Sequence, residues 1–150
     1  MTIHLVVYKL NDYYQNPNIM ETIKAESNNY PKPNGGIVLA CSGASDMGEL
    51  TDKVARKLRD NKAYNMKCLA MVAADNKAII ETLQTMDTLV IDGCPTDCGK
   101  KIMEEAWLTN YRYIRLTDFG YEKGKTPVTE ELIDKIYKRI LDLQEYNIVK

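Results

Sequence analysis

The sequence predicts a single three-layer α/β domain, in which a mostly parallel open sheet carries helices on both faces. Two observations predict it. Short, continuous apolar runs, which are typical of strands buried on both faces, alternate along residues 36–150 with segments whose apolar residues recur every three to four positions. The chain has 150 residues, of which 45% are hydrophobic and 27% charged, so it can form one core without disulfides or metal. No internal repeat competes with this interpretation.

Residues 1–35 are predicted to form an N-terminal strand and a polar extension. Residues 3–9, IHLVVYK, have the composition of a strand, whereas the following residues up to Gly36 are rich in Asn, Tyr, Pro and Gly and show little periodicity. The turn-forming run at 31–36 ends this segment. The apolar run at 37–41 then begins the α/β domain of residues 36–150.

Two helices are expected before the second of the buried strands. The first covers about residues 47–60, with Asp46 as its cap in a capping box with Glu49. A second helix is expected to begin after Asp75 as its cap and to lead into the apolar strand at 88–92. The apolar faces of the two helices consist of Met47, Leu50, Val54 and Leu58, and of Ile79, Ile80, Leu83 and Met86.

A third helix is expected after the loop at residues 93–98, and it is followed by a strand and a terminal helix. Residues 112–116 alternate as in a strand near a sheet edge. The inward positions of the third helix are predicted to be Ile102, Met103, Ala106 and Trp107, and those of the long terminal helix Leu132, Ile133, Ile136, Tyr137, Ile140 and Leu141. Alternating strands and helices favour right-handed crossovers between parallel strands, as in Rossmann or flavodoxin-like folds.

Three of the four cysteines are predicted to meet at the carboxyl edge of the sheet, where open α/β sheets bind their ligands. Cys41 ends the strand at 37–41, Cys94 follows the strand at 88–92, and Cys98 begins the next helix. If the two strands are neighbours, as in a flavodoxin-like order, they lie about 4.8 Å apart. Their thiols would then be within reach of one metal ion.

The position of Cys68 depends on where its strand lies. If the strand is at about 63–68, Cys68 ends it and joins the other thiols, and residues 69–75 form the loop into the next helix. If the strand is at about 68–73, Cys68 lies a strand length away, roughly 17 Å. We favour the first alternative, because it leaves no thiol unexplained.

Four cysteines at one edge predict a zinc site, since Cys41, Cys68, Cys94 and Cys98 would supply four soft ligands for a tetrahedral ion. The single histidine, His4, excludes a site with two imidazoles. Four thiolates would leave no open position, whereas three would admit water or a small thiol- or sulfur-containing ligand. The alternatives are a thiol enzyme, with a Cys94/Cys98 redox pair or a Cys41 nucleophile, an iron–sulfur cluster on the same cysteines, or inert buried cysteines.

Other side chains near these cysteines are candidates for supporting roles. The loop with Ser42, Gly43 and Ser45 joins a strand to a helix N-terminus, a place that suits an anion or a thiolate. Asp92 is predicted either to support the site, as a general base, an oxygen ligand or a partner of a ligand, or to hold backbone N–H groups of the adjacent turn. Lys101 would offset the charge of a zinc tetrathiolate.

Composition and motifs exclude several function classes. The net charge of −1 provides no electrostatic reason to expect nucleic acid or an anionic membrane as partner. Short apolar runs and the lack of a secretory pattern at the start favour a cytoplasmic location, where cysteines are reduced. The sequence contains no Walker loop and no G-x-G-x-x-G, and Met47 stands where a phosphatase loop would carry Arg.

Four segments occur in an order that resembles a known family: residues 39–45, residues 68–70, residues 91–95 with Cys98 and Lys101, and residues 116–118. Together they resemble the DGC-domain family of zinc-binding proteins, which is named for a triplet found here as Asp92-Gly93-Cys94. The resemblance covers about residues 36 to 125. It implies that all four cysteines belong to one pattern and that the domain binds zinc, and it implies no particular reaction. One difference is visible at 71–75, where family members have glycines and this chain reads MVAAD.

Overall fold

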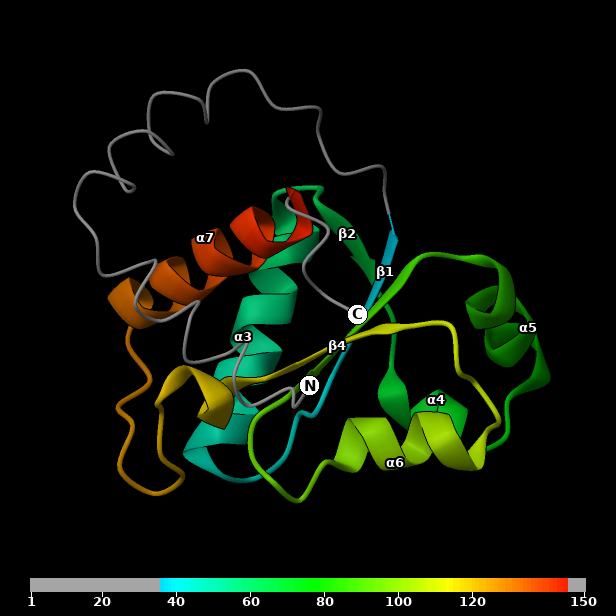
Figure 1. The fold of residues 1–150 in the computed structure, drawn as a ribbon, viewed down its shortest axis with the longest axis horizontal. Helices are drawn as coiled ribbons and strands as arrows, with labels where there is room; N and C mark the ends of the chain where they lie inside the picture. The colour runs from blue at the N-terminus through cyan, green and yellow to red at the C-terminus, as the bar shows by residue number, and fades with distance from the viewer. Residues whose placement is uncertain (1–35, 146–150) are drawn as a thin grey trace, which may run out of the picture. The chain divides into compact units, whose positions relative to one another are not determined.

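The computed structural model describes residues 36–145, and within them it has one sheet of four parallel strands (Figure 1). The strands are β1 (Gly36–Ala40), β2 (Tyr64–Met66), β3 (Thr88–Asp92) and β4 (Arg112–Arg115), in the order β2-β1-β3-β4. The strand predicted at residues 3–9, and with it the proposed division of the chain at residue 35, lies outside the described residues.

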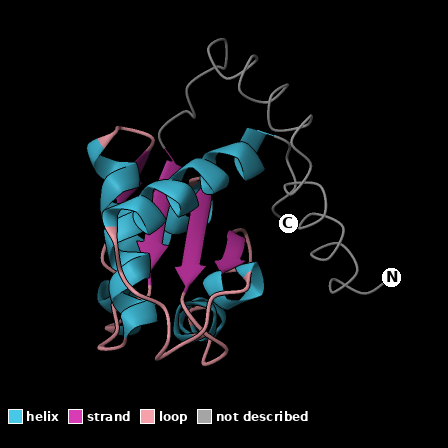
Figure 2. Cartoon of the chain, turned by 90° about the vertical axis from the view of Figure 1, so that its left-hand side faces the viewer, coloured by secondary structure: helices cyan, strands magenta, loops and turns pink. Residues whose placement is uncertain are grey.

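Helices cover both faces of this sheet, as predicted (Figure 2). The helices α3 (Asp46–Asp60) and α7 (Glu130–Glu145) pack on one face, and α4 (Leu69–Ala73), α5 (Lys77–Thr85) and α6 (Cys98–Glu105) lie on the other. A short 3-10 helix, η1 (Leu116–Phe119), follows β4. Alternate strand residues divide between the two cores, so that Val38 faces the first and Leu39 the second. Among the helices of residues 36–145, none combines the length and the apolar character that a membrane-spanning segment needs.

The neighbours β1 and β3 bring two distant loops together. Their register pairs Ala40 with Ile91, and the Cys41 N–H extends the ladder by donating to the Ile91 carbonyl over 3.0 Å. The order thus has the adjacency that the flavodoxin-like interpretation required. The segments that follow the two strands therefore begin side by side.

Both predicted helix caps are wrong by one residue. Ser45, not Asp46, caps α3, because its hydroxyl accepts from the Gly48 N–H, while the Asp46 carboxylate accepts instead from the backbone N–H groups of Gly124 and Thr126. The segment expected to be a loop at 69–75 contains the short helix α4. Asp75 ends that helix in the left-handed conformation, so the cap of α5 is the next residue, Asn76.

Trp107 was predicted to face the core, and this is wrong, because its side chain is 89% exposed. Helix α6 ends at Glu105, and Trp107 takes a left-handed conformation with φ 58° just beyond it. The Leu108 N–H then bonds to the Met103 carbonyl, as in a Schellman motif. This turn redirects the chain so that Leu108, and not Trp107, is buried.

Candidate thiol site

All four cysteines lie at the carboxyl ends of strands, and none is in a disulfide. Cys41 follows β1 directly, Cys68 follows β2 by two residues and is the N-cap of α4, and Cys94 and Cys98 follow β3. The strand ending at Met66 decides between the two positions considered for Cys68 in favour of the first. One edge of the sheet therefore carries every thiol of the chain.

Within this edge, the structure brings Cys41 and Cys98 close together. The two side chains are near enough to interact electrostatically, and the Gly43 N–H also points to the Cys41 sulfur. Cys41 is half-buried, whereas Cys98 is exposed at the first position of α6. Burial and the neighbouring Cys98 raise the pKa of Cys41 to about 11. In the metal-free protein, Cys41 is therefore a protonated thiol at neutral pH.

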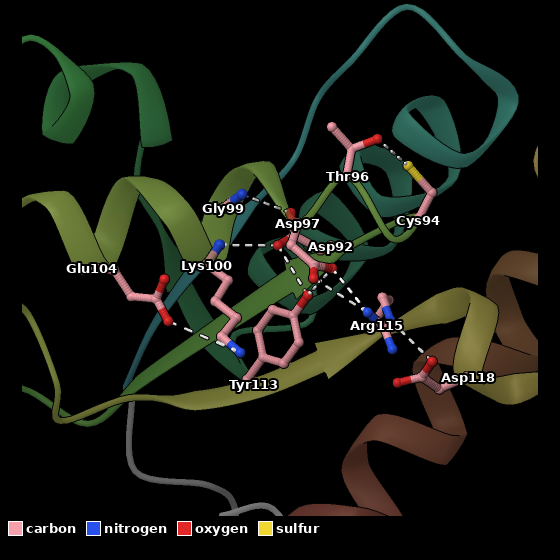
Figure 3. A network of polar contacts seen from close by, with 10 residues as sticks. All are labelled: Asp92, Cys94, Thr96, Asp97, Gly99, Lys100, Glu104, Tyr113, Arg115 and Asp118. Atoms are coloured by element: carbon pink, nitrogen blue, oxygen red, sulfur yellow. Dashed lines mark hydrogen bonds and ion pairs between the residues drawn. The ribbon is translucent and has the colours of Figure 1, made fainter. Parts of the chain in front are cut away.

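Cys94 has a different environment. Its sulfur lies 3.4 Å from the Thr96 hydroxyl, and this hydrogen bond lowers the pKa of the Cys94 thiol (Figure 3). The strand ends at Asp92 and the chain bends at residues 93 and 94, so the alternation of a strand does not continue to Cys94. Figure 3 accordingly shows the side chains of Asp92 and Cys94 turned toward different neighbours.

Cys68 completes the set of thiols but is exposed, and its side chain makes no capping hydrogen bond on α4. Across residues 36–145, no three His, Cys, Asp or Glu side chains are grouped closely enough to hold a metal ion. The structure thus pairs Cys41 with Cys98. Cys68 and Cys94 would have to turn toward this pair to complete a tetrahedral set.

The buried carboxylate of Asp92 holds the start of α6. Asp92 is 1% exposed and accepts from the backbone N–H groups of Gly99, at 2.8 Å, and Lys100, at 2.9 Å. The N-cap residue Asp97 makes no side-chain capping bond of its own, so Asp92 satisfies the free N–H groups of the helix from the end of β3. A carboxylate at this end of a helix also interacts favourably with the helix dipole.

Two glycines allow the close packing around Asp92. A Cβ atom at Gly93 would lie 2.7 Å from the carbonyl oxygen of Met47, in the first turn of α3. A Cβ atom at Gly99 would lie 2.8 Å from Val90 and 2.9 Å from the Asp92 carboxylate. In the Asp-Gly-Cys triplet, the aspartate therefore binds the first turn of α6, and the glycine leaves room for the first turn of α3. The cysteine lies on the bend that follows the strand.

The remaining predicted residues lie around this edge of the sheet. The Ser42 hydroxyl donates to Asp52 over 2.8 Å, and the Ser45 hydroxyl is engaged at the start of α3. Gly43 turns its N–H to Cys41, as described above. Lys101 is exposed on α6.

Sequence reasoning missed a cluster beside the thiols that involves β4. The Tyr113 hydroxyl donates to Asp97 over 2.9 Å, and Arg115 Nη1 lies 3.2 Å from both oxygens of the same carboxylate (Figure 3). The only available signal was the alternation of the segment, which places Tyr113 and Arg115 on one face of the strand. Nothing in the sequence alone connects that face to Asp97.

Fold and site together define a parallel α/β domain with its cysteines gathered at the carboxyl edge of the sheet. The chain belongs to the DGC domain family, which it matches over residues 37–140, so the resemblance is confirmed. It is 27% identical over 88 residues to a protein of Pseudomonas aeruginosa named "Anaerobic and virulence modulator AnvM", an alignment that covers 58% of this chain and 67% of that protein. No solved structure matches the chain.

Proposed function

We propose that this DGC domain binds one zinc ion through Cys41, Cys68, Cys94 and Cys98. The observation that carries the proposal is the position of Cys41 and Cys98, which follow the neighbouring strands β1 and β3 at one edge of the sheet and lie close enough to interact. Two soft sulfur ligands that lie close together are the start of a zinc or related thiolate site. Membership of the DGC family supports the grouping of all four cysteines.

The two other thiols can join this pair without disturbing the core. Cys68 is exposed, and Cys94 is only partly buried, with its sulfur 3.4 Å from the Thr96 hydroxyl. Rotation of these side chains therefore removes little packing. A site closed by four thiolates has no position for water, so we expect it to retain or transfer the ion and not to hydrolyse a substrate.

Proton release is part of the proposed binding, because metal ligands are thiolates. Cys41 has a pKa of about 11 in the metal-free chain, so its proton is still present at pH 7 and must leave on binding. The Gly43 N–H, which already points to this sulfur, would stabilise the resulting thiolate. Zinc affinity should therefore rise with pH throughout the neutral range.

The test is elemental analysis of full-length protein purified anaerobically without a metal-affinity tag, followed by chelator competition. We expect about one zinc per chain, and a loss of at least roughly 100-fold in affinity in Cys41→Ser and Cys98→Ser. Ser42→Ala, in the same loop, is the matched control and should change affinity less than about threefold. Stoichiometric zinc in the Cys41→Ser/Cys98→Ser double variant would overturn the proposal.

The same proximity favours a second candidate function, a redox dithiol. The sequence suggested Cys94 with Cys98, whereas the interaction of Cys98 with Cys41 favours a Cys41–Cys98 pair. Oxidation in a buffer of small thiol and its disulfide, followed by peptide mapping, should then yield a Cys41–Cys98 bridge in metal-free protein. The iron–sulfur alternative is tested on the anaerobic preparation by iron content and visible absorbance.

A further inference from the structure

We infer that Tyr113 and Arg115, two side chains of β4, are positioning residues for the Cys98 thiol. Acting through Asp97, they hold the first turn of α6 in the place where Cys98 lies close to Cys41. The inference rests on the proposed function only in treating this thiol pair as the centre of the site. The hydrogen bonds given above for these two side chains go to carboxylates, and neither residue belongs to the Asp-Gly-Cys motif.

The backbone of Asp97 is the first observation. Among residues 36–145, four non-glycine residues have a positive φ: Lys62, Asp75, Asp97 and Trp107. Three of them follow the end of a helix, where this conformation is common. Of the four, Asp97 alone is itself the N-cap of a helix, with φ 54° and ψ 43°, directly before Cys98. Aspartate adopts this conformation more readily than most residues with a side chain, but the conformation still costs free energy relative to the right-handed region, so contacts that favour it help to fix the turn before Cys98.

The contacts of Asp97 provide that restraint. Its N–H donates to the Cys94 carbonyl over 3.1 Å, closing the turn, and its carboxylate is bound by the Tyr113 hydroxyl at 2.9 Å and by Arg115 at 3.2 Å. Arg115 is itself fixed by Asp118, with 2.9 Å between Nε and the carboxylate (Figure 3). Tyr113 and Arg115 of β4, together with Asp118 of η1, thus restrain Asp97, the residue that precedes Cys98. We call these three side chains the clamp.

Asp92 fixes the residues on the other side of Cys98. It binds the N–H groups of Gly99 and Lys100, and its second oxygen lies 3.1 Å from the Tyr113 hydroxyl. Tyr113 therefore links the two carboxylates that flank Cys98. Burial, together with the nearby charges of Asp92 and Asp97, strongly raises the pKa of Tyr113, so its hydroxyl keeps its proton at neutral pH.

Tyr113 and Arg115 affect the position of Cys98 and not its exposure to solvent. Cys98 itself is exposed, and its side chain gains its place from the backbone that is held on both sides. If the clamp is loosened, the first turn of α6 can shift relative to β1, which carries Cys41. Each thiol would then react singly as before, while the two would less often be close enough to act together.

The experiment uses full-length, metal-free protein with Cys68→Ser and Cys94→Ser, so that only the pair remains. A short bifunctional thiol-alkylating reagent measures the rate at which Cys41 and Cys98 are bridged, and a monofunctional reagent of the same reactivity measures each thiol alone. We expect Tyr113→Phe and Arg115→Gln to lower the bridging rate at least fivefold, with single-thiol alkylation changed less than twofold. Tyr111→Phe, which alters a half-buried tyrosine outside the clamp, is the control and should match the parent.

Three outcomes would overturn the inference. They are bridging at the parental rate in both folded variants, a parent protein that forms no bridge, and an equal loss in Tyr111→Phe. Arg115→Lys, which keeps a positive charge beside Asp97, should restore part of the bridging lost in Arg115→Gln. Circular dichroism verifies the fold of each variant. Zinc content of the chain with all four cysteines is measured separately, so failure of the proposed function is distinguished from failure of the clamp.

Discussion

The replacement Asp92→Asn tests the role of the buried carboxylate most directly. Asparagine keeps the shape of the side chain but offers one oxygen, whereas Asp92 uses its two oxygens for Gly99 and Lys100 at 2.8 and 2.9 Å. One N–H group of α6 would then face an amide donor in a site that is 1% exposed. Losing one hydrogen bond to a charged group costs about 1.5–3 kcal/mol, and losing the charge at the helix N-terminus costs about 0.3–1 kcal/mol more. We expect a loss of about 3 kcal/mol.

Urea unfolding followed by circular dichroism measures this loss. With an m value of about 2 kcal/mol/M, 3 kcal/mol lowers the midpoint by roughly 1.5 M. Asp60→Asn is the matched control, because Asp60 is exposed, forms an ion pair with Arg59 at the surface and should contribute less than about 1 kcal/mol. A change below about 1 kcal/mol in Asp92→Asn would refute the reasoning, since it would mean that the N–H groups of α6 do not depend on this carboxylate.

Two further predictions concern Trp107 and the order of thiol reactivity. Trp107→Gly should leave the free energy of unfolding unchanged or raise it by up to about 1 kcal/mol, because glycine accepts the left-handed conformation and the lost side chain is 89% exposed. Urea unfolding followed by circular dichroism measures this change. A clear loss of stability would show that the indole ring makes stabilising contacts. In metal-free protein at pH 7.5, iodoacetamide should modify Cys94 well before Cys41. The pKa of Cys94 is lowered, whereas the pKa of Cys41, about 11, leaves on the order of 100-fold less thiolate than in an ordinary cysteine. The Cys41 rate should rise about tenfold per pH unit up to about pH 11, and mass spectrometry showing the reverse order would contradict these environments.

Much of the fold follows from local patterns in the chain. The buried strands at 37–40 and 88–92 are continuous apolar runs, and α3 and α7 show apolar residues at helical spacing, so each could be placed before any contact was known. Because parallel strands present their carboxyl ends at one edge, the same patterns also placed the cysteines there. The helix starts could not be placed from local patterns alone. Asp46 accepts hydrogen bonds from the N–H groups of Gly124 and Thr126, about 80 positions away in the chain, and the neighbouring Ser45 caps α3.

The sequence by itself determined the fold class, the family and the sheet edge on which the thiols lie, because strand and helix periodicities and the Asp-Gly-Cys segment are local features. Only the tertiary structure decided that Cys98 lies close to Cys41, that Asp92 caps α6, and that Tyr113 reaches Asp97 from β4. These arrangements depend on strand order and on how closely α6 approaches β3. Both are set by packing between segments far apart in the chain, and no local pattern records them.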